Sequence, residues 1–575
     1  MNIFQYYFYY LLSFFQFGKQ QVPIVKPHIV VIISDDMGWN DVGFHGSNEI
    51  PTPNIDALAY NSVILNRHYV MPTCTPSRAA FLTGRHPIRM GLQGIPMNVA
   101  EPRGVPLREK LLPEYLQKLG YVTRLVGKWH LGYYTEQHTP TRRGFDSFAG
   151  YYGGVIRYFN HVVTKNKHTG IDFHKDNPHR IEPYQNGQYF TDFISDEAED
   201  IIRRHDKQRP LYLQLAHLAG HSTEGIESLE VRNITEVNQN LAYIGDINRR
   251  KYAGVIAALD DSVGRIVKAL KDTKMLENTV ILFMSDNGSP TTIAPYTNHG
   301  SNYPFRGMKG SIFEGGIRVP SFVFHPLIKD RTRVSDEYIH ITDWLPTFVK
   351  LAGGDPSTIT DIDGMDQWTT ITGQQKSKRD SMLINIDEVY GPESAIMGRY
   401  KLVRDVHKYY DYYGQDYNMY SPSYDLRNIM LSMAGQALKK LNVTDFTLPN
   451  EDRILELRKK ATVTCVHKVF YPKCINKRTC LFDIISDPCE TTDIAGERPD
   501  IKVALSKFVD SYRSVLINQT NTYIDPAGYP EHFNGYWMPW MSHEYIPPRN
   551  RNKTAIWNDN VFCEGYPMDD PRNCL

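Results

Sequence analysis

An unbroken apolar run near the amino end constrains the fold more than any other feature. Residues 29–33 read IVVII, without the alternation of polar and apolar positions that marks a half-buried strand. Such a run predicts a strand buried on both faces, as in a parallel sheet flanked by helices. Residues 280–284 (VILFM) form a second run of this kind. We therefore expect an α/β fold with a large mixed, mostly parallel central sheet.

Strand and helix signals alternate between these two runs. Apolar residues recur at steps of three and four from Val255 to Leu270, which predicts an amphipathic helix packed on the sheet. Residues 111–119 predict another helix, and residues 341–352 predict a third that Pro346 interrupts. Further strands are expected over residues 121–126 and 211–215. This order is typical of a doubly wound sheet with helices on both faces.

The chain is too long for one ordinary domain, at 575 residues. After about residue 375 the sequence changes to shorter strands, more aromatic residues and clustered cysteines. We expect a large α/β domain over residues 22–380 and a smaller α+β domain with an antiparallel sheet over residues 381–575. Residues 523–548, rich in Tyr, Trp and Pro, are expected to wrap the surface in extended form.

The amino end has the pattern of a targeting segment. Residues 1–17 are apolar and aromatic, and the polar residues 18–21 (GKQQ) follow. This run is too short for a good membrane span, and it predicts a signal peptide over residues 1–21. A buried amino-terminal strand or helix is the alternative. Since no later run is long and apolar enough to cross a bilayer, no membrane span is expected in the mature protein.

The charge balance argues against one class of partner. The chain has 64 basic residues (Lys and Arg) and 64 acidic residues (Asp and Glu), and no basic tract stands out. Proteins that bind nucleic acid present a basic patch or stripe to the phosphate backbone. Nucleic acid is therefore not an expected partner of this chain.

The cysteines indicate the compartment. Six of the seven fall in the last quarter of the chain, namely Cys465, Cys474, Cys480, Cys489, Cys563 and Cys574. An even number favours complete pairing in an oxidising compartment, although the connectivity stays open. Glycosylation tripeptides at Asn233, Asn442, Asn518 and Asn552 fit the secretory pathway, either a lysosomal or a secreted protein. The odd cysteine, Cys74, then needs an explanation of its own.

Cys74 opens a segment with helix signals, residues 74–85 (CTPSRAAFLTGR). Pro76 suits a first helical position, and Gly84 can end the helix in a left-handed conformation. Cys74 would then lie just before the amino end of a helix, among free N–H groups and a positive dipole. A buried structural thiol is the alternative, because free cysteine is among the most buried residue types.

Oxygen-bearing side chains follow both apolar runs. Asp35 and Asp36 come directly after the first run, and Asp286 and Asn287 come after the second. In open α/β sheets, ligands bind at the edge where the carboxyl ends of the strands emerge. Carboxylate and amide oxygens suit calcium or magnesium and not zinc. The pattern therefore favours a metal site, although Asp and Asn are also common turn residues after strands.

Several cationic side chains accompany these acids. Lys128 and His130 follow a predicted strand, Lys309 lies in a Gly-rich loop, and Arg78 lies one helical turn beyond Cys74. Taken singly, each fits a solvated surface charge. Together with a divalent cation and a helix amino end, they predict a pocket for a tetrahedral oxyanion.

These motifs resemble the signatures of the type I sulfatases. Residues 74–85 are similar to the first signature of that family, and residues 120–132 (GYVTRLVGKWHLG) are similar to the second. The agreement continues through residues 140–146, 286–288, 306–316 and 341–347. Over residues 28–387 the chain looks most like the arylsulfatase B group, the N-acetylgalactosamine 4-sulfatases. The carboxyl-terminal part resembles the family much less.

The resemblance implies a fold, a modification and a metal ion. The fold would be the alkaline-phosphatase-like α/β sandwich with a smaller carboxyl-terminal domain. A formylglycine-generating enzyme would oxidise Cys74 to formylglycine, reading Pro76 and Arg78 as part of its recognition sequence. One calcium ion would be bound by the family's ligand set, which falls here on Asp35, Asp36, Asp286, Asn287 and residue 74.

The resemblance also assigns roles in catalysis. Arg78 and Lys128 would hold the hydrated aldehyde, and His130 would take its proton in the elimination step. Lys309 and His221 would bind sulfate and protonate the leaving oxygen. His221 departs from the family pattern, because Ser222 follows it where Pro or Glu-Pro is common. His217 is a rival, although its place in a predicted strand favours a core histidine.

The implied function is hydrolysis of sulfate esters, on N-acetylgalactosamine 4-sulfate units of glycans. One alternative keeps the mechanism but acts on small aryl or glucoside sulfates such as glucosinolates. A phosphatase or phosphonate hydrolase and an inactive binder of sulfated glycans are further alternatives. The family's paired cysteines are absent from the loops over residues 93–107 and 152–188, so glycan recognition by these loops does not transfer.

Overall fold

The computed structural model describes most of the chain in one continuous body. The described residues are 26–223, 228–291, 297–406, 411–417, 421–466 and 471–544. The predicted signal peptide, Asn552, Cys563 and Cys574 lie outside them. Among the described helices, none combines the length and the apolar character that crossing a membrane requires.

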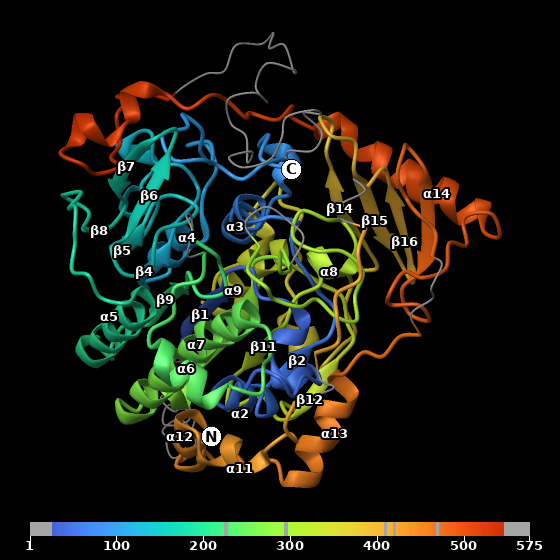
Figure 1. Cartoon of the computed structure of the whole chain (residues 1–575), viewed down its shortest axis with the longest axis horizontal. Helices are drawn as coiled ribbons and strands as arrows, with labels where there is room; N and C mark the ends of the chain where they lie inside the picture. Colours follow the sequence, from blue (N-terminus) through green and yellow to red (C-terminus); the bar gives the residue numbers. More distant parts are fainter. Residues whose placement is uncertain are drawn as a thin grey trace, which may run out of the picture.

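A nine-stranded mixed sheet forms the centre of the molecule (Figure 1). Its strand order is β12-β2-β11-β10-β1-β9-β4-β5-β8. The five strands from β10 to β5 run parallel, and antiparallel pairs join β11 and β8 to them. These strands are β1 (His28–Ser34), β2 (Val63–Leu65), β4 (Val122–Lys128), β5 (Ser147–Tyr151), β8 (His174–Asp176), β9 (Leu211–Ala216), β10 (Thr279–Ser285), β11 (Ser321–Phe324) and β12 (Arg333–Ser335).

Both faces of this sheet are covered, which explains the unbroken apolar run in β1. Val30 and Ile32 pack into the core on one face, whereas Ile29, Val31 and Ile33 pack into the core on the other. Each fully buried side chain of this size contributes about 1.5–3 kcal/mol relative to exposure. A polar residue at any of the five positions would therefore face a core and not solvent.

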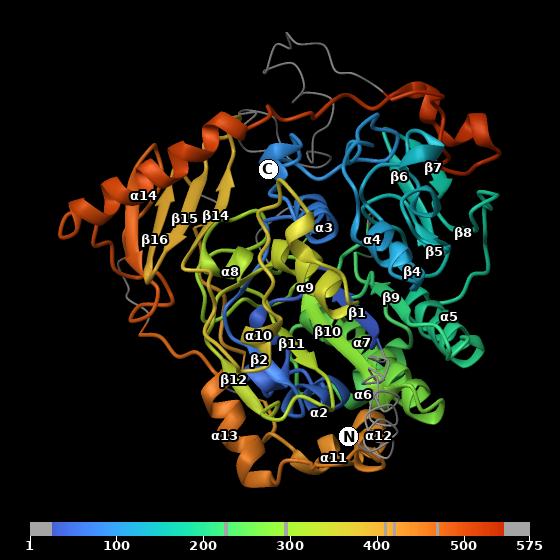
Figure 2. The same ribbon diagram turned by 180° about the vertical axis from the view of Figure 1, so that it is seen from behind.

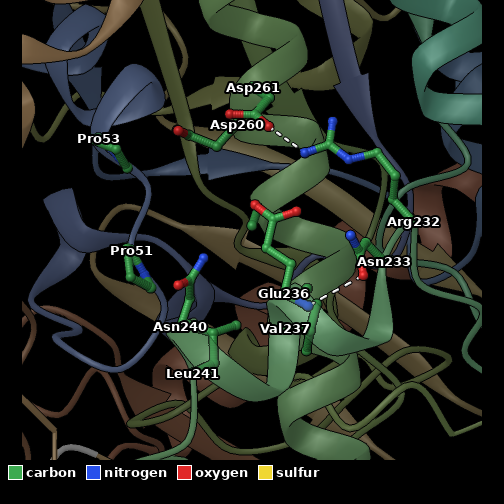
Figure 3. Close-up of a pocket in the computed structure, with 12 residues that line it drawn as sticks. Pro51, Pro53, Arg232, Asn233, Glu236, Val237, Asn240, Leu241, Asp260 and Asp261 are labelled. Carbon is green, nitrogen blue, oxygen red and sulfur yellow. Dashed lines mark hydrogen bonds and ion pairs between the residues drawn. The ribbon is translucent and has the colours of Figure 1, made fainter.

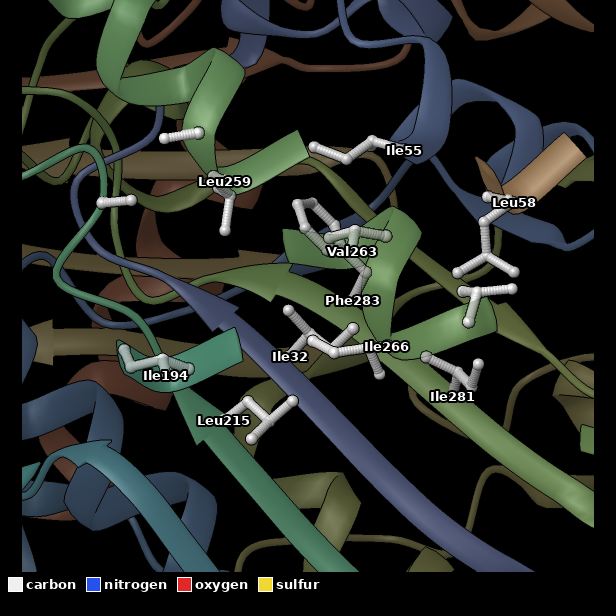
Figure 4. Packing of buried hydrophobic residues seen from close by; sticks show 14 of the residues in the cluster. Ile32, Ile55, Leu58, Ile194, Leu215, Leu259, Val263, Ile266, Ile281 and Phe283 are labelled. Atoms are coloured by element: carbon white, nitrogen blue, oxygen red, sulfur yellow. The ribbon is translucent and has the colours of Figure 1, made fainter. Parts of the chain in front are cut away.

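Helices form the two outer layers. The long helix α7 (Ile247–Asp272) packs with α2 (Pro53–Tyr60) and α5 (Phe190–Arg204) on one face, where Val263 and Ile266 meet Ile32 and Phe283 (Figure 4). The other face carries α3 (Cys74–Thr83), α4 (Leu112–Lys118) and α9 (Trp344–Leu351). The amphipathic helix predicted around Val255–Leu270 is confirmed as part of α7, and its apolar positions face the sheet.

A second, antiparallel sheet lies beside the first, as Figures 1 and 2 show from opposite sides. Its strands are β14 (Ser381–Ile386), β15 (Glu393–Met397), β16 (Tyr400–Arg404) and β17 (Thr479–Asp483), and α14 (Pro499–Ser511) packs on it. Between β16 and β17 the chain returns to the large sheet as α11 (Leu426–Leu431), α12 (Met433–Lys439) and α13 (Glu451–Ala461). The carboxyl-terminal third therefore contributes to both parts of the molecule.

A buried charge cluster joins the two sheets. Nζ of Lys401 in β16 lies 2.8 Å from Oε1 of Glu314 and 2.9 Å from Oε1 of Glu490. Glu314 opens the short helix α8 (Glu314–Ile317), which belongs to the larger part of the chain, and it also accepts from Tyr69 at 2.8 Å. None of the three charged side chains is exposed, so the junction depends on their mutual pairing.

The segment 516–541, here called the carboxyl-terminal strap, crosses the molecule from α14 towards β7 (His168–Ile171) (Figure 1). It contains two short 3₁₀ helices, η12 (Pro526–Gly528) and η13 (Pro530–Phe533). The extended form predicted for residues 523–548 is therefore only partly right, and residues 545–548 lie outside the described residues. Backbone N–H groups of Thr520 and Asp525 donate to carbonyls of Gly91 and Ala100 at 2.9 and 2.8 Å. The strap thus holds the segment that follows α3.

Two predictions at helix ends need correction. Helix α3 begins at Cys74 itself, with Thr73 as its N-cap, so Pro76 is its third residue and not its first. Helix α9 begins at Trp344, and Pro346 falls in its first turn, where a missing N–H costs nothing. The predicted interruption at Pro346 is therefore wrong.

The described residues of the carboxyl-terminal part contain two disulfides. Cys465 pairs with Cys489, and Cys474 pairs with Cys480. Cys74 is the free cysteine of the described residues, and it is buried. Disulfides are typical of an oxidising compartment, which agrees with the secretory pathway.

Candidate active site

Two parallel strand ends bring the predicted acidic residues together. Ser34 of β1 lies opposite Ser285 of β10 in register, so the residues that follow each strand emerge side by side. The backbone N–H of Asp36 donates to Oδ1 of Asp286 at 3.2 Å, and Nδ2 of Asn287 donates to Oδ1 of Asp36 at 2.7 Å. All these side chains are buried, so the structure places the predicted metal ligands in one cluster.

Each carboxylate of the cluster pairs with a cation, and of these cations Lys128 and Arg78 are buried whereas Lys309 is partly buried. Nζ of Lys128 lies 2.8 Å from Oδ2 of Asp35, and Nζ of Lys309 lies 2.7 Å from Oδ2 of Asp36. Arg78 reaches Oδ2 of Asp286 through Nη2 at 2.8 Å and Nε at 3.1 Å. The structure thus pairs three of the four cationic side chains that the sequence predicts for an oxyanion pocket, Lys128, Lys309 and Arg78, with these carboxylates.

These pairs set the charges of the buried groups. Burial acts to raise the pKa of Asp35, but Lys128, His221 and Arg78 together hold it below its ordinary value. Burial acts to lower the pKa of Lys309, but Asp36 raises it above that of an exposed lysine. We therefore treat Asp35 as a carboxylate and Lys309 as an ammonium at neutral pH.

Cys74 lies at the centre of these charges. Its Sγ is 3.8 Å from Oδ1 of Asp35, and the side chain is 1% exposed. Burial raises the pKa of the thiol to about 12, although Lys128 and Lys309 oppose the shift. An unmodified Cys74 is therefore a neutral thiol, in a form that reacts poorly as a nucleophile.

His130 follows β4 and has one ring nitrogen engaged. Its Nε2 lies 2.9 Å from the carbonyl oxygen of Met97, so Nε2 carries the proton. Its buried Nδ1 has no hydrogen-bond partner in the described part of the chain and presents a lone pair. Burial, together with Lys128, lowers the pKa of His130 well below its ordinary value.

His221 and not His217 faces the acidic cluster. Nε2 of His221 lies 3.2 Å from Nζ of Lys309 and 3.4 Å from Oδ2 of Asp36, while Nδ1 contacts the carbonyl of Ser222 at 2.6 Å. His217 is fully buried, and neither of its ring nitrogens has a hydrogen-bond partner among the described residues. The change to Ser222 after His221 therefore leaves the histidine in the cluster.

The residues present fit a hard cation. Ligand atoms of Asp35, Asp36, Cys74 and His221 all lie within 4.8 Å of one another. Oδ1 of Asn287 is buried and has no hydrogen-bond partner in the described ranges, so it is available as a further oxygen ligand. The oxygen-rich donor set suits calcium or magnesium. Asp286 is not among these four residues, since Arg78 donates to its Oδ2 and the N–H of Asp36 donates to its Oδ1.

Sequence reasoning missed a serine that fixes the geometry of the strand ends. Oγ of Ser285 accepts the backbone N–H of Met37 at 3.0 Å and donates to the carbonyl of Asn287 at 2.8 Å. Its position in the motif gave a signal, because Ser285 precedes Asp286 as Ser34 precedes Asp35.

A pocket elsewhere in the molecule is separate from this cluster (Figure 3). It lies among helix α6 (Ile234–Asn240), α7 and the turn before α2, and Arg232, Glu236, Asp260 and Asp261 line it. Arg232 is already paired with Asp261 at 2.6 Å. None of the predicted site residues contributes to this pocket.

Comparison with known proteins places the chain in a family. A family model described as Sulfatase matches residues 27–354. Arylsulfatase J of Mus musculus is 33% identical over 526 residues, which cover 90% of this chain and 81% of the relative. N-acetylgalactosamine-6-sulfatase of Homo sapiens is 33% identical over 371 residues, covering 60% of this chain and 66% of that protein.

Solved structures agree with the fold. Ps i-CgsB in complex with k-i-k-neocarrahexaose has a TM-score of 0.66 and 25% identity, covering 88% of this chain and 96% of that chain. The predicted alkaline-phosphatase-like fold, with its mostly parallel sheet and smaller antiparallel sheet, is confirmed. The relatives named above share the family but are not arylsulfatase B, so that finer resemblance stays a prediction. The chain belongs to the sulfatase family, and it is a sulfuric ester hydrolase of the arylsulfatase type.

Proposed function

We propose that this protein hydrolyses sulfate esters through a formylglycine made from Cys74, with a calcium ion bound beside it. The observation that carries the proposal is the position of Cys74, whose buried Sγ lies 3.8 Å from Asp35 at the start of α3. A buried thiol with a raised pKa does not suit direct catalysis, whereas a hydrated aldehyde at this position would offer two hydroxyl groups. The three paired cations around it fit a sulfate group.

The calcium ion would be held by Asp35, Asp36, Asp286, Asn287 and residue 74. It would supply positive charge that offsets the charge of sulfate and makes a hydroxyl of residue 74 more acidic. Lys128 and Arg78, both buried, pair with Asp35 and Asp286 and fix the positions of the two carboxylates. The chain's own side chains then perform the steps that follow.

In the first step, one hydroxyl oxygen of residue 74 attacks sulfur. The proton of that hydroxyl passes to a neighbouring base, and Oδ1 of Asp35, 3.8 Å from Sγ of Cys74, is a candidate for it. The bond between sulfur and the substrate oxygen breaks, and the leaving oxygen takes a proton from the pair of Lys309 and His221. Their 3.2 Å contact allows the proton to be shared between Nζ and Nε2.

In the second step, the other hydroxyl of residue 74 loses its proton to Nδ1 of His130. The bond from the residue 74 carbon to the sulfated oxygen breaks, sulfate leaves, and the aldehyde is restored. Addition of water then regenerates the two hydroxyl groups. His130 suits this role because Nε2 is fixed by Met97 and Nδ1 has a free lone pair among the described residues.

Conversion of Cys74 has a structural requirement. The side chain is only 1% exposed, so a modifying enzyme could not reach it in the folded protein. We propose that a formylglycine-generating enzyme converts the cysteine to formylglycine before folding, in the secretory pathway. The mature protein would then be lysosomal or secreted.

For the substrate, we propose a sulfated N-acetylgalactosamine unit of a glycan, with the 4-sulfate as the first candidate. A relative named N-acetylgalactosamine-6-sulfatase supports the sugar and adds the 6-sulfate as a second candidate. A solved relative in complex with k-i-k-neocarrahexaose supports an oligosaccharide ligand. Small aryl or glucoside sulfates remain the alternative class, since arylsulfatase J is also a relative.

A hydrolysis panel tests the substrate. The purified protein from a eukaryotic secretory host is incubated with N-acetylgalactosamine 4-sulfate, its 6-sulfate, an aryl sulfate and a glucosinolate, and released sulfate is measured. We expect the highest kcat/KM on one of the two sugar sulfates. A preference for the aryl sulfate or the glucosinolate would overturn the substrate, and no turnover of any sulfate ester would overturn the proposed function.

A further inference from the structure

A fully buried asparagine, Asn298, contacts the backbone of the acidic cluster. The side chain of Asn298 is not exposed. Both the nitrogen and the oxygen of its amide are hydrogen-bonded. Its Nδ2 donates to the carbonyl oxygens of Asp36 and Gly220, at 2.9 and 2.7 Å. Its Oδ1 accepts from Oγ of Ser289 at 2.7 Å and from the N–H of Gly300 at 2.9 Å.

These contacts connect three strand ends. Asp36 follows β1, Gly220 precedes His221 after β9, and Ser289 follows Asn287 after β10. Each strand end carries a residue of the proposed site. One amide side chain therefore fixes the relative positions of the metal ligands and of the histidine beside them.

The backbone at two of these points needs such support. Asp36 has a φ of 58°, in the left-handed region that L side chains rarely adopt. Gly220 has a φ of 103°, and a Cβ there would lie 2.0 Å from the carbonyl oxygen of Asp35. The backbone after β9 therefore packs closely against the backbone after β1. Each of these two buried carbonyl oxygens needs a hydrogen-bond donor, and Nδ2 of Asn298 donates to both.

We propose that Asn298 is a positioning residue for the calcium site: its amide sets the conformation of Asp36 and the distance from Asp36 to His221. This inference rests on the proposed function. Without the amide, two buried carbonyls lose their donor, and the left-handed conformation at Asp36 loses its support. The carboxylate of Asp36 would then be spread over several orientations, and calcium would bind more weakly.

The chain offers a matched control in Asn302. It is also an asparagine, almost fully buried, and bonded within the same loop. Its Oδ1 accepts from the N–H of Ser289 at 2.9 Å, and its Nδ2 donates to the carbonyls of Ser289 and Gly307 at 2.8 and 3.3 Å. Among the described residues, its side chain has hydrogen bonds after β10 but none at the ends of β1 or β9. Loss of Asn302 thus tests the effect of loop stability alone.

The experiment is calorimetric titration of calcium chloride into chelator-treated, full-length protein from a eukaryotic secretory host. For Asn298→Ala we expect a calcium Kd about tenfold or more above that of the wild type, as for loss of other residues that orient metal ligands. Asn298→Ser, which leaves a smaller cavity, should shift the Kd in the same direction. Asn302→Ala should keep the wild-type Kd, even where its melting temperature falls.

The outcomes separate the two proposals. Absence of calcium binding by the wild type would overturn the metal of the proposed function, and the role of Asn298 with it. Calcium binding by the wild type with an unchanged Kd in both Asn298 variants would overturn the positioning role alone. Equal weakening by Asn302→Ala would also overturn it, because loop stability would then account for the effect. If Asn298→Ala does not fold, the Kd of Asn298→Ser decides.

Discussion

Nζ of Lys128 lies 2.8 Å from Oδ2 of Asp35, and neither side chain is exposed. The lysine comes from the end of β4 and the aspartate from the end of β1, two strands separated by β9. A buried ion pair of this kind is destabilised strongly when one partner is removed, because the other charge stays buried without compensation.

Substitution Lys128→Met should therefore reduce stability in a calcium-dependent manner. Without calcium we expect a loss of about 3–5 kcal/mol in the free energy of unfolding. Calcium should restore part of it, because a bound cation would compensate Asp35. Guanidinium unfolding with and without a chelator measures both values. Lys175→Met is the control: its partially exposed pair with Glu197 should be worth less than about 1 kcal/mol. An equal loss for Lys128→Met with and without calcium would contradict a metal beside Asp35.

Substitution Cys74→Ser should stop turnover but not the first chemical step. A serine has one hydroxyl, so it can accept sulfate but cannot expel it by restoring an aldehyde. We expect kcat to fall by about 10³-fold or more, with a sulfate ester accumulating on Ser at this position. Intact-protein mass spectrometry detects the ester, and Cys74→Ala is the control that cannot form it. Wild-type turnover by either variant would rule out residue 74 as the nucleophile.

Substitution His130→Ala should block the second step. The first step does not use His130, so substrate should still be cleaved once per enzyme molecule. Rapid mixing should show a burst of alcohol release followed by slow or no turnover, with sulfate retained on residue 74. His217→Ala is a suitable control, because His217 lies outside the cluster and should affect stability without trapping sulfate. If His130→Ala loses activity and retains no sulfate, the assigned role is wrong.

The charge cluster between the sheets predicts a pH dependence of stability. Burial raises the pKa of Glu490 from 4.5 to about 7, with Lys401 opposing the shift and Glu314 adding to it. The folded protein thus holds a proton that the unfolded chain releases, and stability falls as the pH rises through this range. The stability that the proton on Glu490 contributes is fully present below about pH 4.5 and is lost as the pH rises through about 7.

Substitution Glu490→Gln tests that slope. The amide keeps an acceptor for the N–H of Glu314, which donates to Glu490 at 2.8 Å, and it does not titrate. Between about pH 4.5 and about pH 7, the variant should gain about 3 kcal/mol of stability relative to the wild type. Urea unfolding at several pH values measures this difference. Parallel pH profiles for the two proteins would contradict the raised pKa.

The central sheet could be predicted because its signal is local. Five consecutive apolar residues, Ile29 to Ile33, can be buried only where both faces of a strand are covered, and the structure covers both. The start of helix α3 at Cys74 was harder to predict. Pro76 is permitted at the first and the third residue of a helix, so sequence alone did not show that α3 begins at Cys74.

Candidate site residues could be proposed from the sequence, but the contacts between them could not. Asp35, Asp36, Asp286 and Asn287 stand directly after recognisable strands, which fixes them at one edge of the sheet. The role of Asn298 left no such signal, because it lies in a loop and acts through its amide on two carbonyls. Loop conformation depends on tertiary contacts, and spacing along the chain does not show them.

The formylglycine mechanism depends directly on the chemical form of residue 74 in protein from a eukaryotic secretory host. Mass spectrometry of the proteolytic peptide that contains residues 74–78 measures it directly. The account predicts the mass of the aldehyde or its hydrate, with the arginine and proline of that segment unchanged. Unmodified cysteine throughout an active preparation would contradict the formylglycine mechanism.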